Sequence, residues 1–248
     1  MNLLSNFRIL LKGRPNTRKT VSYASFPGKH YIFLFDPDGT HPLIKHFPER
    51  VNSGEISWDY YHPGNLEMAD AKMRQILEHN PYNNITIDSL TFGGQWSMDY
   101  GLAKASNLDK VGYVRMPGQR EYGVEHNIMM AMIGAGLRLT NCNFFLTAHV
   151  SLKQTFGPDG KLLSSKQRLV SGGQSLAEKV LAAFKNVWHF EEVSNTVDPR
   201  AVPKYLVSTL SMGENIARNV IPNIPKEMDI TNEFLYDVMQ KALKGVKI

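Results

Sequence analysis

The residues best placed to do chemistry form a short run near the N-terminus of the chain. Gly13-Arg14-Pro15-Asn16-Thr17-Arg18-Lys19-Thr20 follows the phosphate-loop pattern G-x-x-x-x-G-K-[ST] at every position except Arg18. In such a loop, backbone N–H groups surround a phosphate, a lysine ammonium binds the β and γ oxygens, and a hydroxyl binds Mg²⁺. The run therefore predicts a site for a nucleoside triphosphate and Mg²⁺, in which Lys19 and Thr20 supply the two side chains. Taken alone, the same residues could also form a basic surface turn.

Arg18 occupies the position at which the pattern has its second glycine. Glycine lets the chain approach phosphate closely and adopt conformations that a Cβ atom disfavours. If the loop needs a positive φ at this residue, we expect strain of about 1–3 kcal/mol. A bound state tolerates that strain, but a misplaced Lys19 would slow hydrolysis. Arg18 therefore puts turnover in question more than nucleotide binding.

A pair of carboxylates follows the apolar run Tyr31–Phe35, which continues into Asp36-Pro37-Asp38-Gly39. In open α/β folds, ligands bind at the edge of the sheet where parallel strands end. One of these two carboxylates could orient an attacking water there. A plain Pro-Asp-Gly turn is the alternative for this segment.

Two further apolar runs also end in polar residues. Ile85–Ile87 leads into Asp88, which would hold Mg²⁺ beside Thr20. Phe144–Thr147 leads through Ala148 to His149, which could sense the γ-phosphate and report it to the segment that follows. Alone, a histidine at the end of a strand is more often just a hydrogen-bonded residue.

These residues need a sheet to position them, and the apolar runs predict one. Several runs are apolar on both faces and alternate with helical patterns, which favours an α/β fold with a mostly parallel central sheet and helices on both faces. The expected strands are Phe7–Leu11, Tyr31–Phe35, Ile85–Ile87, Phe144–Thr147 and Tyr205–Leu210. The expected helices are Lys19–Ala24, Asn65–His79, Gly123–Leu139, Gln174–Phe184 and Asn232–Leu243.

Two stretches between these elements are expected to be loops. Phe92–Gln119 mixes glycine, aromatic and basic residues. Ser151–Gly173 is long, and loops of this length are commonly functional or disordered. It carries four basic residues, so we expect it to bind an anionic partner: Lys153, Lys161, Lys166 and Arg168.

Composition limits the classes of protein to consider. The chain has 248 residues and a formal net charge of +5, which suits an anionic ligand or nucleic acid without choosing between them. We take residues 1–248 as a single domain. With Cys142 as its one cysteine, the chain can form no internal disulfide and no cysteine zinc cluster. We expect a cytoplasmic protein that does not enter a membrane, because no apolar run approaches a membrane span.

In its order of motifs, the chain resembles the RecA-like P-loop ATPases, and most closely their phage branch associated with single-strand annealing and recombination. The resemblance extends over most of the sequence. It depends on the segments Gly13–Thr20, Ala24–Lys29, Phe33–Gly39, Ile87–Thr91 and Leu146–His149.

The resemblance implies roles for individual residues. Lys19 and Thr20 match the phosphate-binding lysine and the magnesium-binding hydroxyl, and Asp88 matches the Walker B carboxylate. Asp38 falls at the position of the catalytic glutamate, and His149 at that of the residue that senses the γ-phosphate. Every residue from Gly13 to Thr20 belongs to the nucleotide cradle.

The resemblance also implies partners. Ser151–Gly173 corresponds to the mobile loop that contacts single-stranded DNA, and Arg218 corresponds to a basic residue presented to the nucleotide of a neighbouring subunit. The implied function is an ATP- and Mg²⁺-dependent, DNA-stimulated ATPase of phage-type recombination or annealing, assembled as a ring or filament in the host cytoplasm. Two alternatives remain: a non-catalytic nucleic-acid-binding or assembly module on a degenerate P-loop fold, and a small-molecule kinase using Arg115 and Arg120.

Overall fold

The computed structural model describes residues 6–104, 117–156, 160–171, 173–194, 202–211 and 216–245. Its centre is an eight-stranded sheet in the order β10-β9-β8-β1-β5-β4-β2-β3. The strands from β8 to β3 in this order are parallel, whereas β9 pairs antiparallel with both β8 and β10. The strands are Arg8–Gly13 (β1), His30–Leu34 (β2), Ile56–Tyr60 (β3), Asn84–Asp88 (β4), Asn143–Ala148 (β5), Asn186–Val193 (β8), Lys204–Ser208 (β9) and Glu227–Asp229 (β10).

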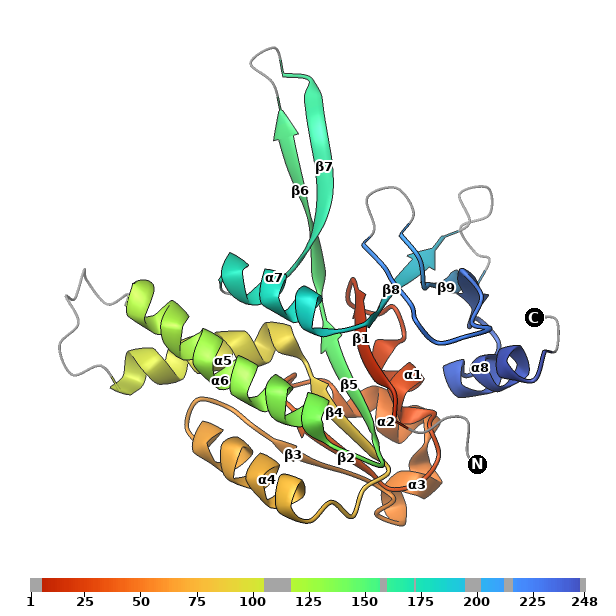
Figure 1. Cartoon of the computed structure of the whole chain (residues 1–248), viewed down its shortest axis with the longest axis horizontal. Helices are drawn as coiled ribbons and strands as arrows, with labels where there is room; N and C mark the ends of the chain where they lie inside the picture. The colour runs from red at the N-terminus through yellow and green to blue at the C-terminus, as the bar shows by residue number, and fades with distance from the viewer. Residues whose placement is uncertain are drawn as a thin grey trace.

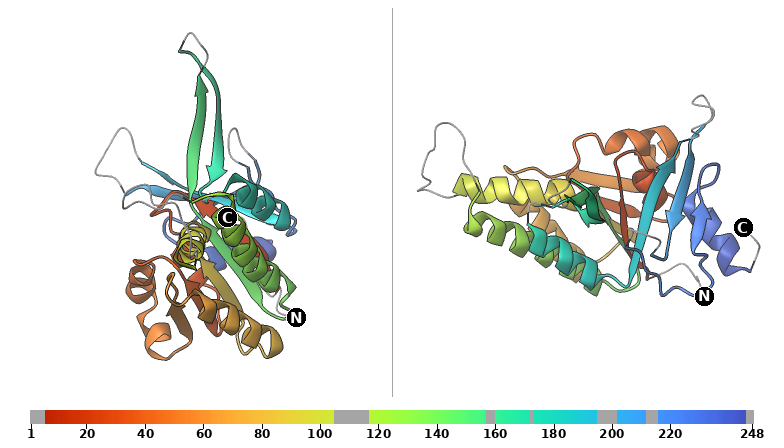
Figure 2. Two further views of the ribbon diagram at one scale, coloured as in Figure 1. Left: turned by 90° about the vertical axis from the view of Figure 1, so that its left-hand side faces the viewer. Right: turned by 90° about the horizontal axis from the view of Figure 1, so that it is seen from above.

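Helices cover both faces of the sheet (Figures 1 and 2). In β1, Leu10 enters one apolar core and Ile9 and Leu11 enter the other, because successive side chains of a strand point to opposite faces. The helices of the first core are α4 (Leu66–Glu78), α5 (Leu90–Lys104), α6 (Gln119–Arg138) and α7 (Gln174–Ala183). Those of the second are α1 (Lys19–Ala24), α2 (Thr40–His46), α3 (Pro48–Asn52) and α8 (Leu235–Leu243).

The fold class predicted from the sequence is therefore confirmed. The chain has an α/β fold, with a mostly parallel central sheet and helices on both faces. The strand that carries the phosphate loop, β1, lies in the middle of the sheet between β5 and β8. Three strands of the sheet had no predicted counterpart, namely β3, β8 and β10.

The prediction of a loop over Phe92–Gln119 is wrong in its first half. Helix α5 continues to Lys104, although it contains two adjacent glycines. A Cβ atom at Gly93 would lie 2.9 Å from the Met129 side chain, and one at Gly94 would lie 2.6 Å from Glu125. Close packing of α5 on α6 therefore overrides the weak helix propensity of glycine.

The prediction of a loop over Ser151–Gly173 is also wrong, because most of this segment is a β-hairpin. Strands β6 (Val150–Phe156) and β7 (Leu162–Leu169) form a separate two-stranded antiparallel sheet. β5 ends at Ala148 and β6 begins at Val150, so His149 joins the central sheet to the hairpin. The hairpin projects away from the sheet and its helices (Figures 1 and 2).

Within the ranges that the structure covers, no helix combines the length and the apolar character needed to cross a bilayer.

Candidate functional site

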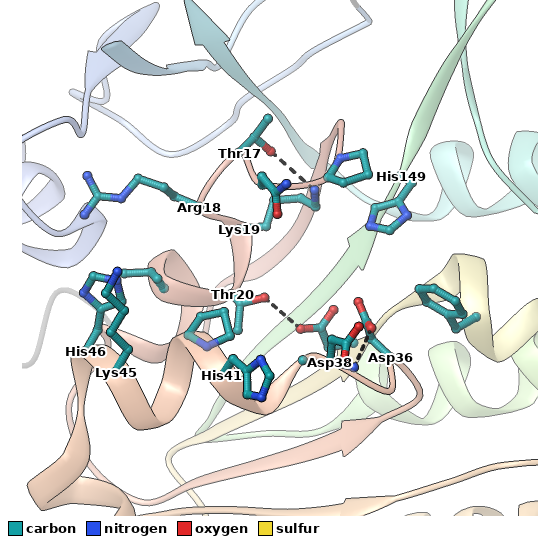
Figure 3. A pocket seen from close by; sticks show the side chains of 17 residues that line it. Thr17, Arg18, Lys19, Thr20, Asp36, Asp38, His41, Lys45, His46 and His149 are labelled. Carbon is teal, nitrogen blue, oxygen red and sulfur yellow. Dashed lines mark hydrogen bonds between the residues drawn. The ribbon is translucent and has the colours of Figure 1, made fainter. Parts of the chain in front are cut away.

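A cavity of about 610 Å³ lies where β1, β2, β4 and β5 end at the carboxyl edge of the parallel sheet (Figure 3). One wall is the phosphate loop with the start of α1, and a second wall is the segment from Asp36 through α2. Asp88, Phe92 and His149 complete the lining. Small-molecule sites commonly occupy roughly 300–1,000 Å³, so the cavity is large enough for a nucleoside triphosphate.

The backbone of the phosphate loop is curled and close to a neighbouring strand. Gly13 pairs with Phe190 of β8, and a Cβ atom at Gly13 would lie 2.3 Å from the Phe190 carbonyl oxygen, so this position requires glycine. Asn16 and Arg18 have φ values of 63° and 67°. Among the described residues, no hydrogen bond engages the backbone N–H groups of Asn16, Thr17 and Arg18. These donors can therefore bind phosphate oxygens.

The ammonium group of Lys19 lies over this loop. Lys19 is buried, and its Nζ donates hydrogen bonds to Gly13 O (3.0 Å), Arg14 O (2.6 Å) and Thr17 Oγ1 (3.3 Å). Burial lowers the pKa of Lys19 to about 8, while the Asp88 and Asp36 carboxylates act to raise it. The negative charge of a bound triphosphate would favour the protonated form further. Lys19 is thus positioned as a phosphate-binding lysine.

Asp88 is the centre of a buried hydrogen-bond cluster beside the loop. Its Oδ2 accepts from Thr20 Oγ1 (3.1 Å) and from the Tyr23 hydroxyl (2.8 Å), and its Oδ1 accepts from Thr147 Oγ1 (2.5 Å). Burial, together with the Asp88 charge, raises the pKa of Tyr23 well above its ordinary value, so Tyr23 stays a donor. These contacts, from α1 and β5, hold the carboxylate of Asp88 in one orientation.

The donor set of this cluster fits a magnesium ion that arrives with a nucleotide. The described residues contain no group of three or more His, Cys, Asp or Glu side chains able to hold a metal. Mg²⁺ usually binds through one or two protein groups together with substrate phosphates and water. The Thr20 hydroxyl and the Asp88 carboxylate are oxygen donors 3.1 Å apart on the same cavity. They are therefore the two residues that would hold the ion.

Asp36 and Asp38 both line the cavity but differ in environment (Figure 3). Asp38 is exposed, and its backbone N–H donates to Asp36 Oδ1 at 3.0 Å. Asp36 is half-buried, and its pKa is raised, first by burial and then by the charges of Asp88 and Asp38. Asp36 therefore joins the site as a second carboxylate, which the sequence had marked only as one of a pair.

His149 lines the cavity at the point where the hairpin begins. Its backbone N–H donates to Thr91 Oγ1 at 3.1 Å, and its ring meets the edge of Phe92 at a centroid distance of 6.0 Å. Burial lowers the pKa of His149, and the charge of Lys19 lowers it further, whereas Asp88 raises it. A neutral imidazole at this place can donate to or accept from a terminal phosphate and its water.

Arg18 has a left-handed backbone at the position where the phosphate-loop pattern has glycine, and its side chain lies at one end of the cavity, away from Lys19. Its Nη1 donates to Ile230 O (2.5 Å) and Thr231 O (2.6 Å), and its guanidinium lies 5.3 Å from the centre of the Tyr205 ring. Figure 3 shows the side chain extending away from Lys19. Contacts with Tyr205 of β9 and with the two residues that follow β10 thus offset the strain at Arg18, and Lys19 keeps its place.

The wall formed by α2 was not predicted from the sequence. It brings His41, Pro42, Lys45 and His46 to the cavity, and of these Lys45 and His46 lie at the end near Arg18 (Figure 3). Burial lowers the pKa of His46, and the charges of Arg18 and Lys45 lower it further. The sequence feature that could have predicted this wall is the run Thr40–His46 directly after the Asp-Gly turn. A helix that begins there must lie beside the strand ends that form the cavity.

Of the predicted cradle residues, all but Gly13 and Arg14 line the cavity. Those two contribute the carbonyl oxygens that hold Lys19. Arg218 lies elsewhere, because its backbone pairs with Val187 near the start of β8 and its Nε donates to Phe184 O at 2.9 Å. The cavity borders the opposite end of the strands, so the expected role of Arg218 toward a neighbouring subunit stays a prediction.

The predicted nucleic-acid-binding residues lie along the hairpin. Lys153 and Lys161 are exposed, and Arg168 Nη1 donates to Gln174 Oε1 of α7 at 3.1 Å. The backbone of Lys166 pairs opposite Lys153, while its side chain lies outside the described part of the structure. Of the two arginines considered for a kinase, Arg120 is exposed on α6 and away from the cavity lining, and Arg115 lies outside the described residues.

No protein-family model matches the sequence, and no curated protein matches it. Among solved structures, the chain is similar to an ATPase from the type III secretion system of pathogenic bacteria, with a TM-score of 0.46 and 9% sequence identity. The match covers 75% of this chain and 51% of that ATPase, so the chain spans about half the length of its structural neighbour.

Proposed function

We propose that the protein is an ATP- and Mg²⁺-binding ATPase that couples nucleotide binding to the binding of single-stranded DNA by its β6–β7 hairpin. The proposal depends most on one observation. Lys19, Thr20 and Asp88 converge on one cavity, and the same cavity is lined by His149, the residue from which the hairpin starts. A single ligand at this place would touch both the phosphate loop and the root of the hairpin.

In phosphoryl transfer, each residue of the site would have a separate role. Lys19 and the loop N–H groups would bind the β- and γ-phosphates, and Mg²⁺ held by Thr20 and Asp88 would neutralise charge that develops on them. Asp38 would orient the attacking water. The pKa of Asp36 is raised, which indicates an unfavourable environment for its charge. Its carboxyl group would hydrogen-bond the attacking water or a water molecule bound to Mg²⁺. His149 would contact the γ-phosphate.

The hairpin supplies the surface for DNA. Opposite residues of an antiparallel pair share one face, so Lys153 lies on the same face as Arg168, which pairs with Ser151 two positions along. Phe156 is 57% exposed near the tip. Basic groups that follow phosphates and an aromatic ring that stacks on bases are the usual elements of single-strand binding. Trp96 is less suited to stacking on bases, because it is half-buried in α5, where its Nε1 donates to Phe35 O at 2.9 Å.

We further infer a role in phage-type recombination or annealing, with subunits assembled as a ring or filament in the host cytoplasm. The motif order of the sequence supports this inference. Its alternative is a non-catalytic binding module, and the specific observation in favour of that alternative is Arg18, which replaces a flexible glycine by a residue fastened to the C-terminal strands.

The first test concerns nucleotide binding. Lys19→Ala should weaken ATP binding by about 100-fold or more, since losing a charged partner of a phosphate costs on the order of 2–5 kcal/mol. Lys29→Ala is the matched control, because Lys29 is an exposed lysine just before β2, at the end of that strand away from the cavity. Equal ATP affinity in wild type and Lys19→Ala, measured by calorimetry with Mg²⁺, would exclude this cavity as the nucleotide site.

The second test separates an ATPase from a binding module. If the chain is an ATPase, wild type should release phosphate, Asp38→Asn should reduce the rate by about 100-fold or more, and ATP binding should persist. Asp36→Asn, measured in parallel, shows which carboxylate orients the water. A wild type that binds ATP and DNA but releases no phosphate would establish the module instead.

The third test concerns DNA. Lys153→Ala should weaken binding of a labelled oligonucleotide and reduce the slope of log affinity against log salt between about 50 and 200 mM. Lys185→Ala, an exposed lysine before β8, should leave both unchanged. If the two variants behave alike, the hairpin is not the DNA-binding surface.

A further inference from the structure

Lys12 is a buried lysine that the proposed chemistry does not use. It precedes Gly13 in β1, is 2% exposed, and lies outside the lining of the nucleotide cavity. Its Nζ donates to the side-chain Oε1 of Gln167 at 3.2 Å, and none of the ion pairs among the described residues includes it. Burial lowers the pKa of Lys12 to about 8. A buried ammonium with an amide partner costs stability that an apolar side chain would not cost.

The partner of Lys12 belongs to the hairpin. Gln167 lies on β7, opposite Leu152, close to the root of the two strands. The same root is held on its other side by Thr91 of α5, which accepts from His149 N and donates to Val170 O (3.0 Å). Hydrogen bonds therefore attach the root of the hairpin both to α5 and to β1, the strand that leads into the phosphate loop.

Lys12 is also linked to the nucleotide site through the backbone. The carbonyl groups of Gly13 and Arg14, the next two residues, accept the ammonium of Lys19 in this structure. Phosphate oxygens are stronger acceptors for an ammonium than carbonyl oxygens. A bound triphosphate would draw Lys19 away from these carbonyls, and the peptide groups next to Lys12 would have to adjust.

A second acceptor for Lys12 lies next to the first. His189 of β8 pairs in register with Lys12 and is 3% exposed, and its Nδ1 has no hydrogen-bond partner among the described residues. Burial, and then the charge of Lys12, lower the pKa of His189 to about 3, so the ring is neutral and Nδ1 can accept when the proton is on Nε2. Gln167 and His189 both line a cavity of about 400 Å³ beside Arg14, which gives their side chains room to move.

We propose that Lys12 is a positioning residue with two acceptors, Gln167 and His189, and that nucleotide binding moves its ammonium from one to the other and so changes the orientation of the β6–β7 hairpin. This inference is based on the proposed function, because it requires a triphosphate to reach Lys19. The phosphate loop and the hairpin would then be two coupled binding sites. The hydrogen bond of Lys12 would have two states, one with each acceptor, and a ligand at either site would favour one of these states.

The test measures the hairpin directly in the full-length chain. Spin labels on Leu163→Cys, exposed on β7, and Met68→Cys, exposed on α4, report the distance between the hairpin and the core. Cys142 is buried and should not be labelled. The probe is the non-hydrolysable analogue AMP-PNP with Mg²⁺. In this labelled background, AMP-PNP should shift the distance distribution.

The variants Lys12→Met and Gln167→Leu should bind AMP-PNP within about threefold of the otherwise unchanged protein, yet show the same distance distribution with and without it. Gln167→Glu keeps an acceptor and should restore the response. Gln167 is only partly buried, so its variants remain informative if Lys12→Met does not fold.

The outcomes separate the two proposals. If AMP-PNP binds but the distance does not change, or if both variants respond as the parent does, the role of Lys12 is excluded and nucleotide binding stands. If AMP-PNP does not bind at all, the proposed function fails, and the role of Lys12 fails with it.

Discussion

The nucleotide cavity and the β6–β7 hairpin meet at His149, but they are held in place very differently. In the cavity, Asp88 is fixed by three hydroxyl groups, and Lys19 by three oxygen acceptors. The hairpin is held at its root through Thr91, Lys12 and Gln174, and β6 is exposed beyond Val150. The proposed site of chemistry is therefore rigidly supported, whereas the hairpin, the proposed binding surface for DNA, has few contacts with the core that would have to break for it to reorient.

The largest effect is expected in the phosphate loop, which belongs to the more tightly held of the two regions. Gly13→Ala places a Cβ atom 2.3 Å from the backbone oxygen of Phe190, which cannot move without shifting β8. We expect a loss of more than about 3 kcal/mol in the free energy of unfolding, measured with denaturant. Gly123→Ala, on open space in α6, is the control and should change stability by about 1 kcal/mol or less. Similar values for the two variants would contradict the tight packing of the loop.

The next effect concerns two buried histidines of the sheet, His30 and His189. Burial lowers the pKa of each to about 3 from 6.5, so each contributes stability that is complete above pH 6.5 and is lost as the pH falls toward 3. We expect each histidine to account for a loss of about 2 kcal/mol in unfolding free energy between about pH 7 and pH 5, and both together for twice that loss. His189→Gln should roughly halve this loss. An unchanged pH profile in that variant would mean that His189 is charged in the folded protein.

A smaller effect is expected at Arg18, where the hydrogen bonds of the side chain stabilise the protein and the strain of the backbone destabilises it. Arg18→Ala removes the hydrogen bonds to Ile230 and Thr231 and keeps a Cβ atom in the left-handed region, so it should destabilise by about 2 kcal/mol. Arg18→Gly loses the same contacts but relieves the strain, so it should be more stable than the alanine variant by about 1 kcal/mol. Thermal unfolding of both variants measures the difference. A glycine variant no more stable than alanine would mean that the backbone at this position is unstrained.

The smallest effects are expected on the hairpin. Phe156→Ala and Lys153→Ala change exposed side chains, so each should alter the unfolding free energy by about 0.5 kcal/mol or less. A loss of more than about 1 kcal/mol in either variant would show that the hairpin packs against the core in solution, and the contrast between the two regions would then be wrong.

Sequence reasoning found the parts of the fold that follow from short-range patterns. The runs before Gly13, Asp36, Asp88 and His149 are apolar on both faces, which is typical of buried parallel strands, and the structure brings their ends to one cavity. Strands β3 and β8 were not predicted. β3 combines Trp58 and Asp59 at the edge of the sheet, and β8 contains a histidine and two glutamates, so neither shows the apolar run of a central strand.

Long-range contacts account for most of what could not be predicted. The direction of the Arg18 side chain depends on Ile230 and Thr231, more than two hundred residues away in the sequence. The role of Lys12 depends on Gln167, and its burial depends on two neighbouring strands. The hairpin was mistaken for a loop because its strands are polar, and only the apolar residues Leu152 and Phe156, an even number of positions apart in β6, hinted at a strand.

The hydrogen bonds of Arg18 have a consequence for the order in which the protein matures during synthesis. The phosphate loop is translated more than two hundred residues before Ile230 and Thr231, so its strained arginine finds these partners only after Thr231 has left the ribosome. Until then, the loop lacks the contacts that offset the left-handed backbone at Arg18. A nascent chain stalled before this point should carry the complete motif without the contacts that hold Arg18, so the finished loop forms only late in synthesis.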